Sequence, residues 1–459
     1  MGEFLKAFRA LVKMPFALWL VIWAFSVDAM AYFGVLTLMK PFIKDDIGLP
    51  GAWSSVPVSI FTMTITVCWM AFGGIAERMG VRRGMITALV IGLTGRVFYA
   101  ASVFTGNLRL STLIISLTIV AVAEGMVQSA AYAGIKQYTD EKNSSMGYAM
   151  LYAIMNVAIV VIGLISPLVR VPGDAAYKAG TLPMSGMAAV NWTCAGLTMI
   201  GLLVYLVFMT PATEAKMMRP PTKAADEGPK KDALTRFAEF FTGTPEAPSP
   251  FRDARFVFFV FMLLPVRTLF AHQWLTMPDY ILRAYDKDVA DKMEWLVNWI
   301  NPGIIFFGVP TITALTKKYN VYTMMIIGTF VSAVPTFLLT TGPNLGILIT
   351  YMVLFSIGEA LWSARFLEYA AELAPEGRMS QYMGLANIPW LLAKGTTGFY
   401  AGYMMERFCP TDGPKQTGTL WLIYGLIAMS TPIGLVLARR WVMIGLKTKP
   451  DAKEAAAAA

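Results

Sequence analysis

Ionisable and metal-binding side chains are scarce in this chain of 459 residues. Only 15% of the residues are charged, a single histidine is present, and the three cysteines, Cys68, Cys194 and Cys409, are scattered. Such cysteine spacing provides neither a disulfide framework nor a metal site. No HExxH, GxSxG or phosphate-binding P-loop pattern occurs. We therefore expect no enzymatic activity, no cofactor, no metal and no ATP-driven mechanism.

Apolar residues, in contrast, are abundant. They make up 56% of the sequence, and 13% of the residues are aromatic. A membrane-spanning helix needs about twenty apolar residues, and segments of that length recur along the whole chain, too long for barrel strands. They predict an all-α membrane protein with twelve transmembrane helices, at residues 16–40, 53–77, 84–104, 110–134, 146–169, 187–210, 254–282, 293–315, 321–341, 344–368, 380–404 and 418–440.

One long polar segment separates six predicted helices from six. Its content of Pro, Lys, Glu and Ala is typical of a flexible linker. We expect an N-terminal six-helix bundle, a cytoplasmic linker, a C-terminal six-helix bundle and a cytoplasmic tail, at residues 1–212, 213–250, 251–445 and 446–459.

Lysine and arginine are concentrated in every second loop. By the positive-inside rule this pattern places both termini in the cytoplasm. The net charge of +9 is accounted for by this topology and predicts no nucleic-acid partner.

Ionisable residues at membrane depth indicate where a site lies, because each costs a few kcal/mol in the bilayer and usually faces water or another charge. Glu359 ends a long apolar run and has no cation three or four residues further on. It shares a helical face with Trp362 and Ser363. Arg365 and Glu368 are three apart and could pair. A buried ion pair that fixes helix packing is the alternative to a functional site here.

Charges of both signs lie in other predicted helices, at Arg96, Glu124, Arg267, Asp279 and Lys394. They could recognise an amphoteric or anionic organic solute near the bilayer midplane. The alternative is static pairing, or snorkelling to the membrane surface, which we favour for Asp279 and Lys394.

The single histidine, His272, belongs to a residue type that titrates near pH ~6.5 and can exchange a proton at physiological pH. A hydrogen-bonded packing role is the alternative. Trp274, Trp362 and Trp390 lie in mid-span and could stack on a solute or pack in the core.

The segment GGIAERMGVRR, between the second and third predicted helices, resembles the signature loop of the major facilitator superfamily. The resemblance covers every defined position, at Gly73, Glu77, Arg78, Gly80, Arg82 and Arg83. Glycines allow a tight turn, and the acid and arginines can cross-link helix ends in one conformation and release them in another. The resemblance implies two six-helix bundles, alternating access and a gating role for these residues.

Within that superfamily the chain resembles the proton-dependent oligopeptide transporter family. Gly358-Glu359, Ser363 and Ala374-Pro375 match its tenth-helix pattern, and the segments 28–34 and 147–156 resemble its first-helix and fifth-helix motifs. The resemblance implies that Glu359 meets a peptide amino group and that Tyr32 and Asn156 line the cavity.

Other family positions differ in this chain. The proton-coupling motif of the first helix retains one acid, Asp28. A family lysine in the fourth helix corresponds to Gln128, and a coupling glutamate in the seventh helix corresponds to His272.

Together these patterns predict a secondary-active transporter that moves a peptide or a peptide-like, amphoteric solute by alternating access with protons as the coupling ion. We expect it to act as a monomer among the lipids of a bacterial cytoplasmic membrane. The alternative is an exporter of amphiphilic drugs or lipid-like compounds. The predicted substrate-binding residues are Glu359, Asn156, Tyr32, Gln128, Arg267, Trp362, Ser363, Arg96 and Trp390, and the predicted proton-coupling residues are Asp28, His272 and Glu124.

Overall fold

The computed structural model describes residues 14–140, 144–217, 242, 250–316, 319–373, 386 and 388–443, and in these ranges the regular structure is helical. The chain forms two compact units, defined here as unit 1 (Met1–Asp226 with Ala290–Pro302) and unit 2 (Glu227–Val289 with Gly303–Ala459). The predicted linker, apart from 213–217, Thr242 and Pro250, and the predicted tail lie outside the described residues. The predicted domain boundaries therefore stay a prediction.

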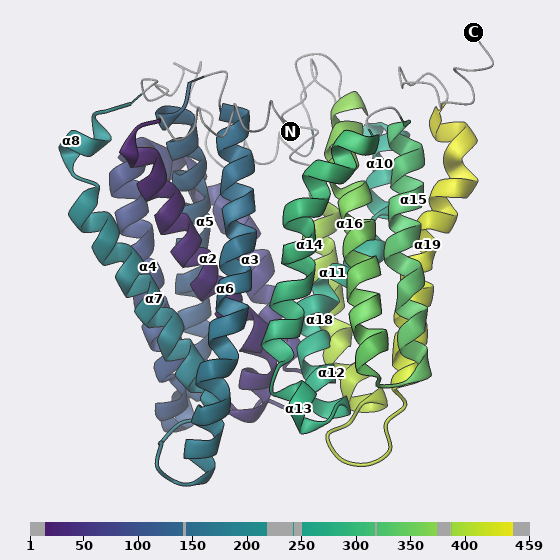
Figure 1. Ribbon diagram of the computed structural model, residues 1–459, viewed down its shortest axis with the longest axis horizontal. Helices are drawn as coiled ribbons and strands as arrows, with labels where there is room; N and C mark the ends of the chain where they lie inside the picture. The colour runs from purple at the N-terminus through teal and green to yellow at the C-terminus, as the bar shows by residue number, and fades with distance from the viewer. Residues whose placement is uncertain are drawn as a thin grey trace. The chain divides into compact units, whose positions relative to one another are not determined.

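Unit 1 is built from long helices that run lengthwise beside one another (Figure 1). Its helices are α2 (Phe16–Asp45), α3 (Ser55–Met79), α4 (Val81–Ala101), α5 (Arg109–Tyr138), α6 (Ser144–Lys178), α7 (Gly186–Phe208) and the short α8 (Pro211–Glu214), with the 3-10 turns η1 (Ser102–Phe104) and η2 (Gly106–Leu108) between α4 and α5.

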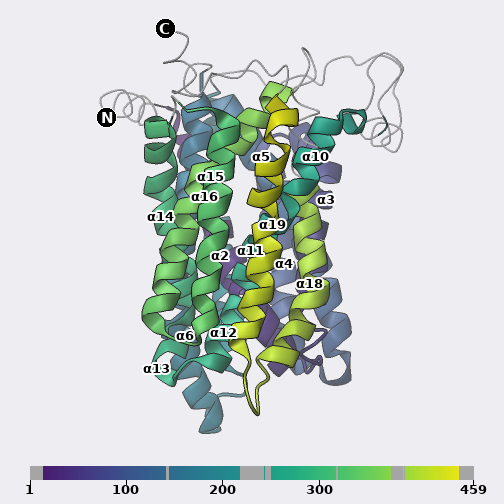
Figure 2. The same ribbon diagram turned by 90° about the vertical axis from the view of Figure 1, so that its right-hand side faces the viewer.

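Unit 2 contains more interrupted helices (Figure 2). They are η3 (Pro250–Arg252), α10 (Ala254–Met262), α11 (Leu264–Leu275), α12 (Met277–Ala284), α15 (Val321–Ala333), η4 (Val334–Thr341), α16 (Leu345–Leu373), α18 (Ile388–Phe408) and α19 (Thr417–Met443), together with the short α13 (Lys287–Ala290) and the greater part of α14 (Met293–Thr316).

Within the described residues, each of the twelve predicted membrane segments overlaps helix; for the segment 380–404 the described helical part is 388–404. Among the residues that the structure describes, nine helices are long and apolar enough to cross a membrane. The predicted fold class, an all-α membrane protein of two helical bundles, is confirmed.

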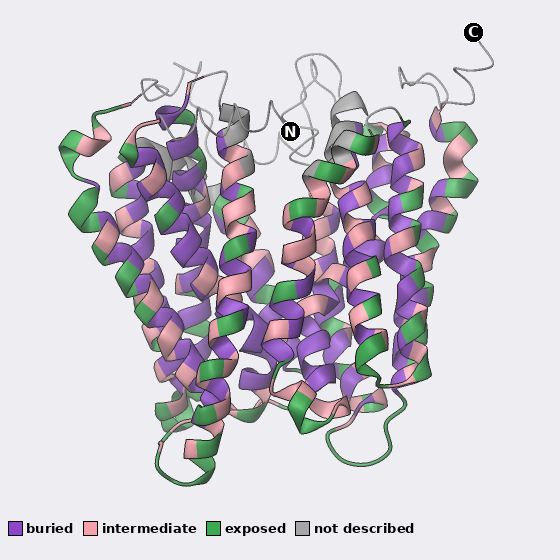
Figure 3. Cartoon of the chain, in the orientation of Figure 1, coloured by how far each residue is buried: buried purple, intermediate pink, exposed green. Residues whose placement is uncertain are grey.

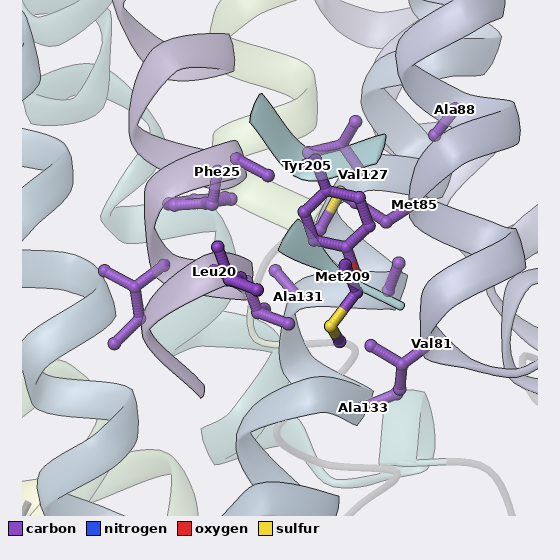
Figure 4. Close-up of a cluster of buried hydrophobic side chains, with 14 of the residues drawn as sticks. Leu20, Phe25, Val81, Met85, Ala88, Val127, Ala131, Ala133, Tyr205 and Met209 are labelled. Atoms are coloured by element: carbon purple, nitrogen blue, oxygen red, sulfur yellow. The ribbon is translucent and has the colours of Figure 1, made fainter. Parts of the chain in front are cut away.

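The core of unit 1 is made of aliphatic and small side chains from α2, α4, α5 and α7. Leu20 and Phe25 of α2 face Met85 of α4, Ala131 of α5 and Tyr205 of α7 (Figure 4). In a bilayer, helices associate through close van der Waals contact, which small interfacial residues permit. This core holds four helices together around the buried charges described below.

The core of unit 2 is richer in aromatic rings. The rings of Phe259 and Phe366 are stacked with their centroids 5.6 Å apart, and Tyr369 lies 4.3 Å from Phe259. Aromatic side chains bury a large apolar area with few rotatable bonds. They join α10 to α16 and form one wall of the cluster around Arg267.

The predicted helix at 254–282 is interrupted in the structure, because Pro265 and Pro278 each remove a backbone donor and crowd the preceding turn. The resulting segments are α10, α11 and α12. At the first break, the backbone N–H of Val266 donates to the hydroxyl of Thr431 on α19 at 3.0 Å. Neighbouring helices commonly satisfy backbone groups at such breaks in membrane proteins.

The outward surfaces of the helices are apolar. Figure 3 shows buried and exposed positions alternating around the long helices. Large apolar side chains are among the most exposed, with Leu168, Val207 and Leu437 at 74%, 65% and 80%. Such surfaces are suited to lipid rather than to water.

Asp46, directly after the first transmembrane helix α2, is an unusual carboxyl group. Its Oδ2 accepts a hydrogen bond of 2.8 Å from the hydroxyl of Ser185, the N-cap of α7. Burial raises the pKa of Asp46 from 3.8 to about 6. The folded protein therefore holds this proton more tightly than the unfolded chain does. The protonated carboxyl of Asp46 therefore adds to the stability of the folded protein at low pH, and this stabilisation is lost as the pH rises from about 4 to about 6.

We predict that Asp46→Asn makes the purified protein more stable to heat than the wild type at pH 7, because the amide avoids the cost of burying a charge. The difference in apparent melting temperature should shrink towards pH 4. Asp45→Asn changes an exposed neighbouring carboxylate and is the matched control. A difference between wild type and Asp46→Asn that is independent of pH would contradict the prediction.

Candidate functional site

Three buried ionisable side chains meet in unit 1. The guanidinium of Arg96 donates to Asp28 Oδ1 at 2.7 Å through Nη1 and to Glu124 Oε1 at 2.6 Å through Nη2. Nη1 also donates to the hydroxyl of Thr198 at 2.9 Å. The three charged residues are only 2–5% exposed. We call Asp28, Arg96 and Glu124 the buried triad.

Close helix packing brings the triad together. Asp28, Arg96 and Glu124 lie on α2, α4 and α5. A side chain at Gly95 would place its Cβ 2.7 Å from a methyl of Val120, so only glycine allows α4 to approach α5 here. This approach places Arg96 against Glu124.

A small cavity adjoins the triad. It has a volume of about 10 Å³ and is lined by Tyr32, Phe61, Arg96 and Tyr99, among others. A volume of this size holds about one water molecule. Tyr32, predicted as a substrate contact, therefore lies beside the buried ionisable cluster.

The charges of the triad do not cancel. Two carboxylates and one guanidinium carry a net charge of −1, and both carboxylates bind the same guanidinium. An uncompensated charge in a low-dielectric interior is costly. Binding one proton neutralises the cluster, so the triad is chemically suited to take up and release a proton.

The other predicted polar residues of unit 1 lie outside the triad. Gln128 is half-buried on α5, one turn beyond Glu124. Asn156 is buried on α6, and its amide donates to the carbonyl of Tyr152 in the same helix at 2.9 Å. Their predicted contacts with substrate stay a prediction.

Unit 2 gathers a second group of predicted residues around Arg267 of α11. The guanidinium carbon of Arg267 lies 5.3 Å from the ring centroid of Trp362, 4.3 Å from that of Phe366 and 5.9 Å from that of Trp390. Glu359 is half-buried on α16 and acts electrostatically on Arg267. Ser363 follows Trp362 and is half-buried.

Static pairing holds other buried charges. Asp279 accepts from Arg283 at 2.6 Å, which agrees with the interpretation favoured from the sequence. Arg170 of α6 forms a buried ion pair with Glu294 within unit 1. The side chain of Glu368 lies outside the described part of the chain, so the proposed pair with Arg365 stays a prediction.

His272 is buried in a hydrogen-bonded aromatic environment. Its ring stacks on that of Tyr424 with the centroids 3.8 Å apart. Nδ1 lies 2.7 Å from the hydroxyl of Thr276, and Nε2 lies 3.1 Å from that of Tyr400. Hydroxyl groups can accept as well as donate, so either protonation state can be hydrogen-bonded. The contacts fit both a packing role and a proton-coupling role.

The predicted signature loop is mostly helical. Because α3 continues to Met79 and α4 begins at Val81, Gly80 alone joins them, with a left-handed φ of 80° that favours glycine. Nε of Arg82 donates to the carbonyl of Met209 at the end of α7, and its backbone N–H donates to Glu214 at 3.3 Å.

The remaining signature residues divide into two groups. Arg83 is exposed. Gly73, Glu77 and Arg78 lie on α3, and their side chains are outside the described part of the chain. Their predicted gating role is untested.

The sequence did not indicate two of these contacts. Thr198 is one of many threonines in the apolar helices. It lies more than a hundred residues after Arg96, so no helical spacing connects the two. Static pairing or snorkelling was favoured for Lys394 from the sequence and stays a prediction; the structure adds that its Nζ lies 5.0 Å from the ring centroid of Trp390. The four-residue spacing of Trp390 and Lys394 was the available signal.

Residues 21–397 match the family model of the Major Facilitator Superfamily. The chain belongs to this superfamily. Its family and fold are those of transporters rather than of enzymes. No curated protein matches the sequence.

Solved structures of POT family transporters share the fold of this superfamily member. A POT family transporter in complex with 5-aminolevulinic acid is 14% identical, with a TM-score of 0.72 over 94% of this chain and 97% of that one. Another, in complex with a thioalcohol conjugated peptide, is 15% identical, with a TM-score of 0.71 over 93% and 96%. The peptide transporter POT in complex with sulfate is 13% identical, with a TM-score of 0.74 over 94% and 96%.

We predict that Arg82→Ala destabilises the protein, because it removes the bond from the start of α4 to the end of α7. A hydrogen bond to a charged group contributes about 1.5–3 kcal/mol. Thermal unfolding of purified protein measures the loss. The exposed Arg83→Ala is the matched control and should unfold like the wild type. Equal destabilisation by both changes would show that positive charge, rather than this contact, is what matters.

Proposed function

We propose that this chain is a secondary-active transporter that moves a peptide or a peptide-like, amphoteric solute by alternating access, with protons as the coupling ion. The observation that carries the proposal is the buried triad, which has one more carboxylate than guanidinium in the interior of a membrane protein. A site of this charge changes its energy greatly when it binds a single proton.

The triad provides the proton step. With a proton bound, the carboxyl pair and Arg96 form a neutral cluster that the low-dielectric interior tolerates. Without the proton, the cluster carries a negative charge, which favours a conformation that gives it access to water. The small cavity beside Tyr32 and Arg96 offers a place for such a water. Because Arg96 is bonded to both acids, we assign it to the proton site and not to direct substrate binding.

Unit 2 provides the substrate step. Glu359 offers a carboxylate for a cationic group, Arg267 offers a positive charge for an anionic group, and Trp362 offers a flat apolar surface. The similar POT family structures hold 5-aminolevulinic acid and a conjugated peptide. An amino group and a carboxylate on one small molecule match the two signs of charge in unit 2.

The setting follows from the sequence pattern. The bundle 1–212 would rock against the bundle 251–445. The signature residues around Arg82 would hold the cytoplasmic ends of the helices together in one conformation and release them in the other. The positive loops support a topology with both termini in the cytoplasm, and a bacterial cytoplasmic membrane is the setting that we propose. We propose a monomer surrounded by lipid. Export of amphiphilic compounds is the alternative that the following experiment distinguishes.

Proteoliposome assays test proton coupling. A pH difference of one unit supplies about 1.4 kcal/mol per proton, enough for about tenfold accumulation of a solute carried with one proton. We predict that the wild type accumulates labelled alanyl-phenylalanine along an imposed proton gradient and that a protonophore abolishes the accumulation. Proton-driven extrusion of a cationic amphiphile without peptide uptake would favour the exporter.

Substitutions in the triad locate the coupling. Asp28→Asn and Glu124→Gln should end gradient-driven accumulation while exchange of labelled for unlabelled dipeptide continues, since exchange needs no net proton movement. Asp45→Asn, an exposed carboxylate on the same helix α2, is the matched control. Gradient-driven accumulation by both triad variants would contradict the assignment.

Glu359→Gln tests the cationic contact. The amide keeps the shape of the side chain and removes its charge. Truncating one side of a buried charge pair costs about 2–5 kcal/mol, so affinity for alanyl-phenylalanine should fall at least about 30-fold. Asp288→Asn, an exposed carboxylate of unit 2, is the control for binding and folding. Wild-type affinity in Glu359→Gln would exclude this contact.

A further inference from the structure

Arg267 differs from three other arginines of the protein, which are paired. Arg96, Arg170 and Arg283 each form an ion pair with a carboxylate. Within the described part of the chain, Arg267 makes no ion pair, and its Nε has no hydrogen-bond partner although the residue is only 9% exposed. Its guanidinium lies over the faces of Trp362, Phe366 and Trp390.

Lys394 brings a second cation to the same indole. It lies on α18 one turn after Trp390, and α18 packs against α11, which carries Arg267. The Lys394 ammonium lies 5.0 Å from the centroid of Trp390 and the Arg267 guanidinium lies 5.9 Å from it. The two cations are therefore at most about 11 Å apart. Two like charges near one ring repel each other, and an anion placed between them would relieve this repulsion.

The charges around this ring favour an anion. Arg267 and Lys394 bring two positive charges to this ring, and Glu359 acts on Arg267 with a negative charge. Aromatic faces attract cations but carry no net charge and accept no strong hydrogen bond from a guanidinium. A carboxylate bound between the two cations would provide both a negative charge and strong hydrogen-bond acceptors.

We propose that Arg267, Lys394 and Trp390 form a carboxylate-binding subsite inside unit 2, and that Lys394 is a substrate-binding residue. The inference rests on the proposed function and specifies its substrate class: a zwitterion whose carboxylate adjoins an aromatic or large apolar group. The amino end is bound by Glu359, the carboxylate by Arg267 and Lys394, and the apolar group by Trp362 and Phe366. Unit 2 thus binds both ends of the substrate, while the triad of unit 1 binds the proton.

Binding of two matched probes tests the subsite. Alanyl-phenylalanine and its C-terminal amide differ only in the carboxylate. Their affinities for the purified full-length protein are measured by thermal stabilisation, since a ligand that binds the native state raises its apparent stability. We expect the wild type to prefer the carboxylate by about 30-fold or more, the effect of one buried charge contact.

Variants assign the preference to Lys394. Lys394→Gln should reduce the preference to a few-fold by weakening the carboxylate probe alone, while its unchanged affinity for the amide shows that the variant is folded. Lys394→Arg restores a cation and should retain the preference. The exposed Lys415→Gln is the matched control and should behave as the wild type. Glu359→Gln should weaken both probes equally, since both carry the amino group.

Three results would overturn the inference: equal wild-type affinity for both probes, binding of neither probe, or a full preference retained in Lys394→Gln. Its failure is distinguishable from that of the proposed function. A carboxylate preference that depends on Lys394, in a protein whose transport ignores the proton gradient, would leave the subsite in place and remove proton coupling.

Discussion

The bond network of Arg96 with Asp28 and Glu124 is the interaction on which the rest of unit 1 depends. A charge in a membrane interior must be paired or hydrated. Pairing in turn requires that α2, α4 and α5 meet at one point, and the small residues along their contacts allow it. Gly95 is the clearest case, because any side chain there would separate α4 from α5.

The two units stabilise a buried arginine in different ways. Unit 1 surrounds its central arginine with carboxylates and is left with an excess of negative charge. Unit 2 surrounds Arg267 with the faces of aromatic rings, and in the described part of the chain Arg267 forms no ion pair. One arrangement is suited to a proton and the other to an anionic group. These charges support the proposed division of roles between the two units.

The broken helix in unit 2 positions Arg267. α10 ends at Met262, and Pro265 lies in the first turn of α11, two residues before Arg267. The hydroxyl of Thr431 on α19 accepts from the backbone N–H of Val266 next to the break. Discontinuous helices often line the binding sites of transporters, because irregular backbone at membrane depth is stable only beside protein or water. Arg267 and His272 both lie on α11, which begins at this break.

Hydrophobic run lengths in the sequence determined the twelve helices, because a chain in lipid must satisfy every backbone donor and acceptor within the segment. The signature residues around Gly80 indicated the superfamily, the intramembrane charges identified Arg96, Glu124 and Glu359 as candidates, and the resemblance to the transporter family added Asp28. Only the tertiary structure decided which charges are partners. Arg96, which was expected to meet substrate, lies between two carboxylates from other helices, and its contact with substrate stays a prediction. Helical spacing relates neighbours within four residues, whereas pairing across helices depends on how their small residues let them pack.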